Sequence, residues 1–251
     1  MNSKPGNTPV LYDDPALFQA YDAMRMQDGT LNEVVEIPSL ISLMPKLAGI
    51  AVADLGCGTG AMCRWLLTQG AVSVTGFDAS GRMLSQAREQ SPDTNNLHYV
   101  QADLEVLHLP QNSFDLILSS LALHYVTDFT TVVRSVSAAL KPGGCFIFSV
   151  EHPVVTCHRR EWLTGEDGTR SCWPVDHYLD EGPRSIGWMG SENVPRHHRM
   201  IASYVNSLLD AGLVLNRLIE PGPSEEAIAR WPRLADQRRR PPFLLIKASR
   251  I

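Results

Sequence analysis

Short apolar runs alternate with amphipathic segments over the middle of this 251-residue chain. Five apolar runs predict buried β-strands, at 50–55, 72–78, 97–103, 114–121 and 145–151. Between them, helical spacing of apolar residues follows a glycine-rich loop at 56–60, begins again near Ser80 and recurs over 129–144. Strands that alternate with helices form right-handed βαβ units, so we expect a parallel sheet with helices on both faces.

The pattern is different on either side of this region. Upstream, helical spacing predicts a helix over 15–27 and a longer one over 30–48, which Pro38 kinks or divides. Downstream, residues 152–197 show little periodicity and hold three of the five tryptophans, so we expect an irregular excursion. The pattern over residues 198–251 predicts a helix at 200–212, strands at 213–220 and 242–249, and a short helix and loop between those strands.

Charge and cysteine content narrow the class of protein. The net charge is -5, which argues against non-specific nucleic-acid binding, because that requires a cationic surface. No apolar run approaches the ~18 residues that span a bilayer, and the first residues lack the apolar stretch of a secretory signal. Five scattered cysteines without a C-x-x-C pair predict free thiols and no metal site. We therefore expect a cytoplasmic enzyme, monomeric or homodimeric, that acts on a small molecule without a nucleic-acid or membrane partner.

The glycine-rich loop, Asp54-Leu-Gly-Cys-Gly-Thr-Gly60, is the strongest candidate ligand site. Its glycines permit positive φ and bring the backbone close to a ligand at a helix N-terminus. Asp78, at the end of the second strand, is placed to accept hydrogen bonds from two ribose hydroxyls. The spacing also fits a dinucleotide fingerprint, so an NAD(P)-dependent oxidoreductase is a competing interpretation. Asp54 disfavours it, because a carboxylate there would repel a pyrophosphate but stabilise a cationic amino group.

Five segments between residues 52 and 144 carry a family resemblance: VADLGCGTG, VTGFDASGRML, QADLEVLHLP, FDLILSSLALHYV and LKPGG. In this order they resemble the motifs of class I S-adenosylmethionine-dependent methyltransferases. The resemblance implies an α/β, Rossmann-like fold with a seven-stranded, mostly parallel sheet in the order 3-2-1-4-5-7-6, strand seven antiparallel. The two late strands would supply the last pair, and residues 152–197 would be an insertion after strand five. The cofactor implied is S-adenosyl-L-methionine, and the product is S-adenosyl-L-homocysteine.

The resemblance also implies a cofactor site. The methionine end of the cofactor would contact Asp54, Gly56, Cys57, Gly58 and Gly60, and the ribose would contact Asp78. The adenine would lie against Ala79, Met83, Ala102, Asp103 and Leu104, and the sulfonium would face Ser119 and Leu121. Two of these have structural alternatives, since Met83 is also a typical core residue and Asp103 a typical turn cap. Tyr21 and Arg25 share one face of the first helix and would fold over the cofactor, unless that face is simply solvated.

Methyl transfer requires orientation of the acceptor, and a base only where the acceptor must lose a proton. The candidates follow strands four and five, where open α/β sheets bind ligands: His124, Glu151 and His152. The alternatives are a structural role for His124 and anchoring of the insertion for the other two. Tyr125, also after strand four, is a further candidate contact of the substrate. Aromatic and polar side chains of the insertion predict a substrate cap: Trp162, Trp173, His177, Tyr178, Arg184, Trp188, His197 and His198. Alternatively, the tryptophans form a small core for the excursion.

Taken together, the sequence predicts one domain over 1–251, with a helical lid (1–49), a cofactor-binding core (50–151), a substrate cap (152–197) and a segment that completes the sheet (198–251). The expected reaction moves a methyl group to an O or N atom of a small aromatic or heteroaromatic molecule by in-line SN2 displacement. The alternatives are other chemistry with the same cofactor and, less favoured, a nicotinamide-dependent oxidation.

Overall fold

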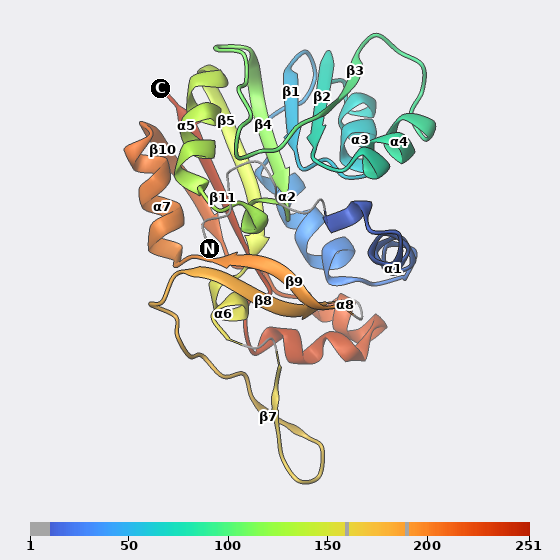
Figure 1. Cartoon of the computed structure of the whole chain (residues 1–251), viewed down its shortest axis with the longest axis vertical. Helices are drawn as coiled ribbons and strands as arrows, with labels where there is room; N and C mark the ends of the chain where they lie inside the picture. The colour runs from blue at the N-terminus through green and yellow to red at the C-terminus, as the bar shows by residue number, and fades with distance from the viewer. Residues whose placement is uncertain (1–10, 159–160, 189–190) are drawn as a thin grey trace.

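Seven strands form one sheet in the computed structural model, which describes residues 11–158, 161–188 and 191–251. The strands are β1 (Ala51–Leu55), β2 (Ser73–Asp78), β3 (Leu97–Gln101), β4 (Phe114–Ser120), β5 (Leu140–Glu151), β10 (Leu213–Ile219) and β11 (Phe243–Arg250). Their order is β3-β2-β1-β4-β5-β11-β10, and β11 runs antiparallel to both of its neighbours (Figure 1). This confirms the predicted topology, with β10 and β11 as the sixth and seventh strands.

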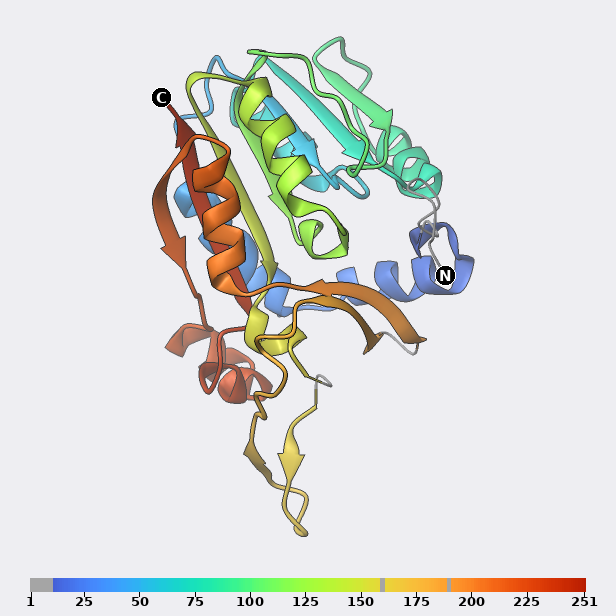
Figure 2. The same cartoon turned by 60° about the vertical axis from the view of Figure 1, so that its left-hand side comes forward.

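Helices cover both faces of the sheet, as predicted. On one face, α5 (Phe129–Ala139) and α7 (Ile201–Asp210) lie side by side and bury their apolar residues in one core cluster (Figure 2). On the other face, α2 (Ile37–Leu43), α3 (Ala61–Thr68) and α4 (Gly81–Glu89) contribute to a second cluster. The central strands are therefore buried on both sides, which explains their continuous apolar runs.

The main differences from the predicted element boundaries lie in three helical segments. The helix expected over 129–144 ends at Ala139, and the LKPGG segment opens β5 instead, because Pro142 cannot continue a helix. The first N-terminal helix, α1 (Pro15–Arg25), follows a short 3₁₀ turn, η1 (Leu11–Asp13). The second begins as a π-helix, η2 (Asn32–Glu36), continues as α2 and ends at Leu43, short of the expected residue 48. Pro38 lies in the first turn of α2, at the division that it predicts.

The insertion after β5 contains more regular structure than its sequence suggests. It holds α6 (Pro153–Thr156) and two hairpins, β6 (Leu163–Thr164) with β7 (Arg170–Cys172) and β8 (Gly182–Trp188) with β9 (Ser191–His198). The β8–β9 hairpin crosses the carboxyl end of the sheet, whereas the first hairpin projects away from it (Figures 1 and 2). Between β10 and β11 lie α8 (Glu225–Arg230) and η4 (Pro232–Arg238), as predicted. Among the described residues, no helix is long and apolar enough to cross a membrane.

Candidate active site

A cavity of about 720 Å³ opens at the carboxyl ends of β1, β2, β4 and β5. Its size is typical of a small-molecule site. Its walls come from the glycine-rich loop, the strand ends, a 3₁₀ turn η3 (Leu123–Tyr125), the N-terminal helices and β9. Parallel sheets place ligands at this edge, because the loops after successive strands converge there.

Most of the predicted cofactor residues line this cavity, together with three predicted acceptor-side residues. They are Tyr21, Arg25, Asp54, Gly56, Cys57, Gly58, Asp78, Ala79, Met83, Ala102, Asp103, Leu104, Leu121, His124, Tyr125 and Glu151. The other predicted residues with described side chains are not in its wall: Gly60, Ser119, His152, Trp162, Trp173, His177, Tyr178, Arg184, His197 and His198. The Trp188 side chain lies outside the described residues.

The three glycines of the loop serve different purposes. All have positive φ, of 77° at Gly56, 53° at Gly58 and 73° at Gly60. A Cβ on Gly56 would lie 2.2 Å from the Ala122 Cβ, and one on Gly60 would lie 2.2 Å from the Tyr99 hydroxyl. The nearest atom to a Cβ on Gly58 is the Tyr21 hydroxyl, at 3.9 Å. Gly56 and Gly60 therefore permit close packing of the turn, while Gly58 leaves room for a ligand.

Asp78 ties the loop to the end of β2. Its carboxylate accepts hydrogen bonds from the backbone N–H of Gly58 at 2.8 Å and of Ser80 at 2.9 Å. Burial raises the pKa of this carboxyl above its usual value. A carboxylate has more lone pairs than these two bonds occupy, so Asp78 retains the capacity to accept from hydroxyls of a ligand.

Asp54 is a second buried carboxylate under the loop, with 1% of its surface exposed. Its Oδ2 accepts a hydrogen bond from the Cys63 thiol at 3.2 Å, and its Oδ1 has no hydrogen-bond partner in the described part of the chain. Burial raises the pKa of Asp54 to about 7, and the neighbouring charges of Asp78 and Glu36 add to that increase. A buried oxygen without a partner, in a negative environment, fits a cationic ligand group.

Met83 and Asp103 make contacts that fit both interpretations, ligand binding and a structural role. Met83 is buried in the protein and also contributes to the cavity wall. Asp103 lines the cavity, and its Oδ1 accepts a hydrogen bond from the Glu105 backbone N–H at 3.0 Å, as expected of a turn cap. Both residues can therefore hold the wall in place while they face a ligand.

Ser119, predicted to face the reacting sulfur, lies instead inside the sheet. It is buried, and its hydroxyl donates to the Leu55 carbonyl at 2.7 Å, between β4 and β1. The next residue, Ser120, lines the cavity, because successive side chains of a strand point to opposite sides. Leu121 follows with a φ of 51°, an uncommon value for a residue with a Cβ, and also lines the cavity.

His124, Tyr125 and Glu151 meet in one part of the cavity wall. His124 is buried, and its Nδ1 accepts a hydrogen bond from the Glu151 backbone N–H at 3.3 Å. The Glu151 carboxylate pairs with the Arg196 Nε at 3.0 Å, and the Arg196 guanidinium lies 4.3 Å from the centre of the Tyr125 ring. The Tyr125 hydroxyl is 2.9 Å from that of Tyr12. Together these contacts join the N-terminal segment, η3, β5 and β9.

His152 lies outside the cavity wall, and its contacts support the anchoring interpretation. Its Nδ1 accepts from the Val154 backbone N–H at 3.1 Å and so caps α6. Its Nε2 lies 2.7 Å from a carboxylate oxygen of Glu220, in the segment after β10. Burial lowers the pKa of His152. The residue therefore joins the start of the insertion to the far end of the sheet.

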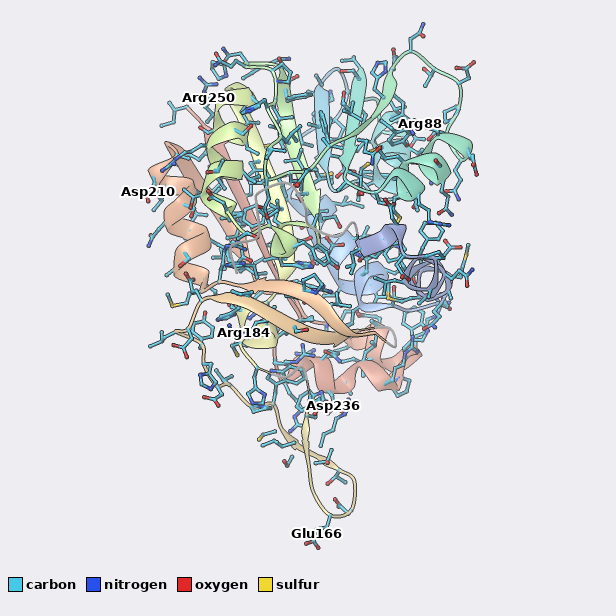
Figure 3. All side chains as sticks on the ribbon, viewed as in Figure 1. Arg88, Glu166, Arg184, Asp210, Asp236 and Arg250 are labelled. Atoms are coloured by element: carbon cyan, nitrogen blue, oxygen red, sulfur yellow. The ribbon has the colours of Figure 1, made fainter. Side chains whose placement is uncertain are left out.

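The predicted cap residues with described side chains lie outside the cavity wall, and two of the tryptophans pack together. The Trp162 and Trp173 rings meet edge-on with centres 5.2 Å apart, and Arg240 lies 3.9 Å from the centre of the Trp173 ring. This is the small core given above as the alternative. Others make local contacts: His177 with Asp180, Arg184 with backbone carbonyls, and His198 with Thr156 and the Tyr178 carbonyl. Figure 3 shows Arg184 on β8 and Glu166 at the tip of the hairpin that projects from the molecule.

Sequence reasoning missed several cavity residues, of which Arg196 is the clearest. Buried and more exposed positions alternate along β9, with Val194, Arg196 and His198 buried. Two of these three buried residues are polar, so the sequence of β9 shows no apolar alternation that would have marked Arg196. Tyr12, Asn32 and Ser120 also line the cavity, but nothing in the local sequence distinguishes them from neighbouring polar residues.

Comparisons with known proteins agree with this geometry. The profile of a family described as "Methyltransferase domain" matches residues 53–148. An S-adenosylmethionine-dependent methyltransferase from Mesorhizobium loti has a solved structure with 44% identity and a TM-score of 0.81, over 86% of this chain and 97% of that one. An uncharacterized protein of Haemophilus influenzae is 33% identical over 98% of both chains. A malonyl-[acyl-carrier protein] O-methyltransferase of Enterobacter lignolyticus is 35% identical, but over only 44% of this chain and 43% of that protein. The chain therefore belongs to the S-adenosylmethionine-dependent methyltransferases.

Proposed function

We propose that the cavity is the active site of a methyltransferase that moves the methyl group of S-adenosylmethionine to an O or N atom of a small, planar acceptor. The observation that carries this proposal is the continuity of the cavity, which joins the glycine-rich loop and Asp78 to the polar end at His124, Tyr125 and Arg196. A ligand at one end and an acceptor at the other would share a single space. Family membership favours this cofactor over the nicotinamide that the glycine spacing also permits.

The loop side of the cavity fits the cofactor. Asp78 would accept from the ribose hydroxyls, Met83 and residues 102–104 would flank the adenine, and Asp54 would take the amino group on its unpartnered oxygen. When bound, S-adenosylmethionine supplies a methyl group already activated by its sulfonium. The protein then needs to orient the acceptor in line with the departing sulfur and to exclude water.

The opposite side of the cavity fits the acceptor. Tyr12 and Tyr125 line it, with the Tyr21 ring packed edge-on against Tyr12 toward the glycine-rich loop, and they supply the flat apolar surface that we first expected from the cap tryptophans. Because the Nδ1 of His124 accepts a backbone hydrogen bond, its neutral ring carries the proton on Nε2. His124 lines the cavity and would help to orient the acceptor there. The Glu151 carboxylate is engaged by Arg196 and would position β9 over the acceptor.

The two segments around the core would act as lid and cap within a single domain over 1–251. In the lid, the Asp13 carboxylate accepts from the Ser80 hydroxyl at 2.6 Å, at the start of α4, while Tyr12 reaches Tyr125. These two contacts tie the lid to the start of α4 and to η3. The cap over 152–197 would contribute through β9, and Arg196 is its residue in the cavity wall together with Pro195.

The test combines binding with product analysis. The protein is titrated with S-adenosylhomocysteine, then incubated with S-adenosylmethionine and a panel of phenols, carboxylic acids and amines, and mass spectrometry follows S-adenosylhomocysteine and methylated acceptor. Asp78→Asn should weaken S-adenosylhomocysteine binding about tenfold or more, since a bond to a charged group is lost. Asp210→Asn, an exposed position on α7 and the matched control, should leave it unchanged. Turnover of the cofactor without S-adenosylhomocysteine would instead indicate other chemistry.

A further inference from the structure

A buried carboxylate of the N-terminal segment lies directly behind the cavity wall. Glu36, in η2, is fully buried, and its Oε1 accepts hydrogen bonds from the hydroxyls of Ser120 at 2.9 Å and Ser149 at 2.5 Å. Its Oε2 accepts from the side-chain amide of Asn32 at 2.8 Å. These bonds fix η2 against the carboxyl ends of β4 and β5, where methyl transfer would take place.

The contact with Glu36 determines how the Asn32 amide is turned. A carboxylate only accepts hydrogen bonds, so the NH₂ group of Asn32 must face Glu36 and its Oδ1 must face away. That oxygen is buried and has no hydrogen-bond partner among the described residues, and Asn32 lines the cavity. The Oδ1 of Asp54, in the same cavity wall, is likewise buried and unpartnered.

Two buried acceptors in one cavity indicate a ligand group that donates hydrogen bonds. The surrounding charge specifies it further, because the carboxylates of Glu36 and Asp78 both make the environment of Asp54 more negative. A protonated amino group carries three donors and a positive charge, so it can satisfy both oxygens and offset that potential. An amide or hydroxyl would satisfy the oxygens without offsetting the charge.

We propose that Asn32 is a ligand-binding residue that Glu36 orients. The Oδ1 of Asn32 accepts a hydrogen bond from the protonated α-amino group of the cofactor, and Asp54 accepts another from the same group. This inference rests on the proposed placement of the methionine end of the cofactor at the glycine-rich loop. An amine acceptor would offer the same chemistry, so the experiment has to distinguish the two sources.

The test compares two ligands in each protein by isothermal titration: S-adenosylhomocysteine and its analogue with hydrogen in place of the α-amino group. Asn32→Ala and Asn32→Ser remove the amide oxygen and should weaken S-adenosylhomocysteine binding about ten- to a hundredfold, since the lost bond is made to a charged donor. Binding of the desamino analogue should change by less than about twofold. Asn206→Ala, at an exposed position of α7, is the matched control. Because both ligands are measured in one variant, a partly unfolded sample lowers both signals alike.

Three results would contradict the inference. Equal effects on the two ligands, or none, would show that Asn32 does not contact the amino group. A loss confined to turnover of amine acceptors, with S-adenosylhomocysteine binding unchanged, would assign the oxygen to the acceptor and overturn the cofactor contact. Failure of the unaltered protein to bind S-adenosylhomocysteine would instead refute the proposed function on which the inference depends.

Discussion

Affinity for S-adenosylhomocysteine should rise with pH through neutrality, because a buried carboxyl must ionise to receive a cationic ligand group. In the ligand-free protein, burial raises the pKa of Asp54 to about 7, so this side chain is mostly protonated and neutral below that pH. A protonated amino group beside it favours the carboxylate and lowers its pKa. Binding below neutrality therefore releases a proton, and the cost of that ionisation falls as the pH rises.

The size of the effect follows from the linkage between protonation and binding. For one group with a pKa of about 7 that must be ionised in the complex, the dissociation constant at pH 6 is about tenfold higher than at pH 8. The number of protons released per ligand should fall from about 0.9 at pH 6 to about 0.1 at pH 8. Titration calorimetry measures both, because buffers with different ionisation enthalpies report the proton count.

The control is Asp54→Asn, which removes the titrating group in place. This variant should bind S-adenosylhomocysteine more weakly than the unaltered protein at pH 8, and with little dependence on pH over the same range. A flat affinity profile in the unaltered protein, with no proton release at pH 6, would refute the reasoning. So would an Asp54→Asn variant that keeps the full pH dependence, because the ionisation would then belong to another group.

Two further predictions concern stability and are measured by denaturant unfolding. Arg196→Met leaves the Glu151 carboxylate buried without its cation and should lower the free energy of unfolding by about 3–5 kcal/mol. Adding Glu151→Gln should recover part of that loss. A double variant no more stable than the single one would contradict a paired role. Gly56→Ala combines a positive φ with a steric overlap and should lower the free energy of unfolding by about 3 kcal/mol or more. Gly143→Ala, at a φ of 79° with no atom within 4 Å, should lower it by only about 1–2 kcal/mol. Similar losses at both positions would show that the overlap relaxes freely.

The strands and their parallel βαβ units were predicted from local signals, whereas the order of the strands in the sheet was what the family resemblance implied. Each βαβ unit has one preferred hand, and short apolar runs separated by amphipathic helices leave few arrangements of the strands. The proposed cofactor residues Asp54 and Asp78 lie in the last two residues of β1 and β2, so a correct strand assignment also places their side chains at the correct edge. Ser119 shows the limit of this reasoning, since a difference of one residue along β4 moves a side chain from the sheet into the cavity.

The acceptor side was harder to predict because it is assembled from three distant parts of the chain. Residue types alone pointed to the tryptophans of the insertion, yet Trp162 and Trp173 pack on arginines that come from the segment between β10 and β11. Which side chains reach the cavity depends on where the β8–β9 hairpin lies, and the contacts that hold it there, among them the buried ion pair between Arg196 and Glu151 and the bond between His198 and Thr156, join distant parts of the chain. A buried carboxylate at a strand end requires a compensating charge or hydrogen bonds, but the chain holds 22 lysines and arginines, and nothing in the sequence singles out Arg196 as the partner of Glu151. Acceptor specificity is therefore best sought in the residues that the lid and the hairpin bring to the strand ends, not in the aromatic content of the insertion.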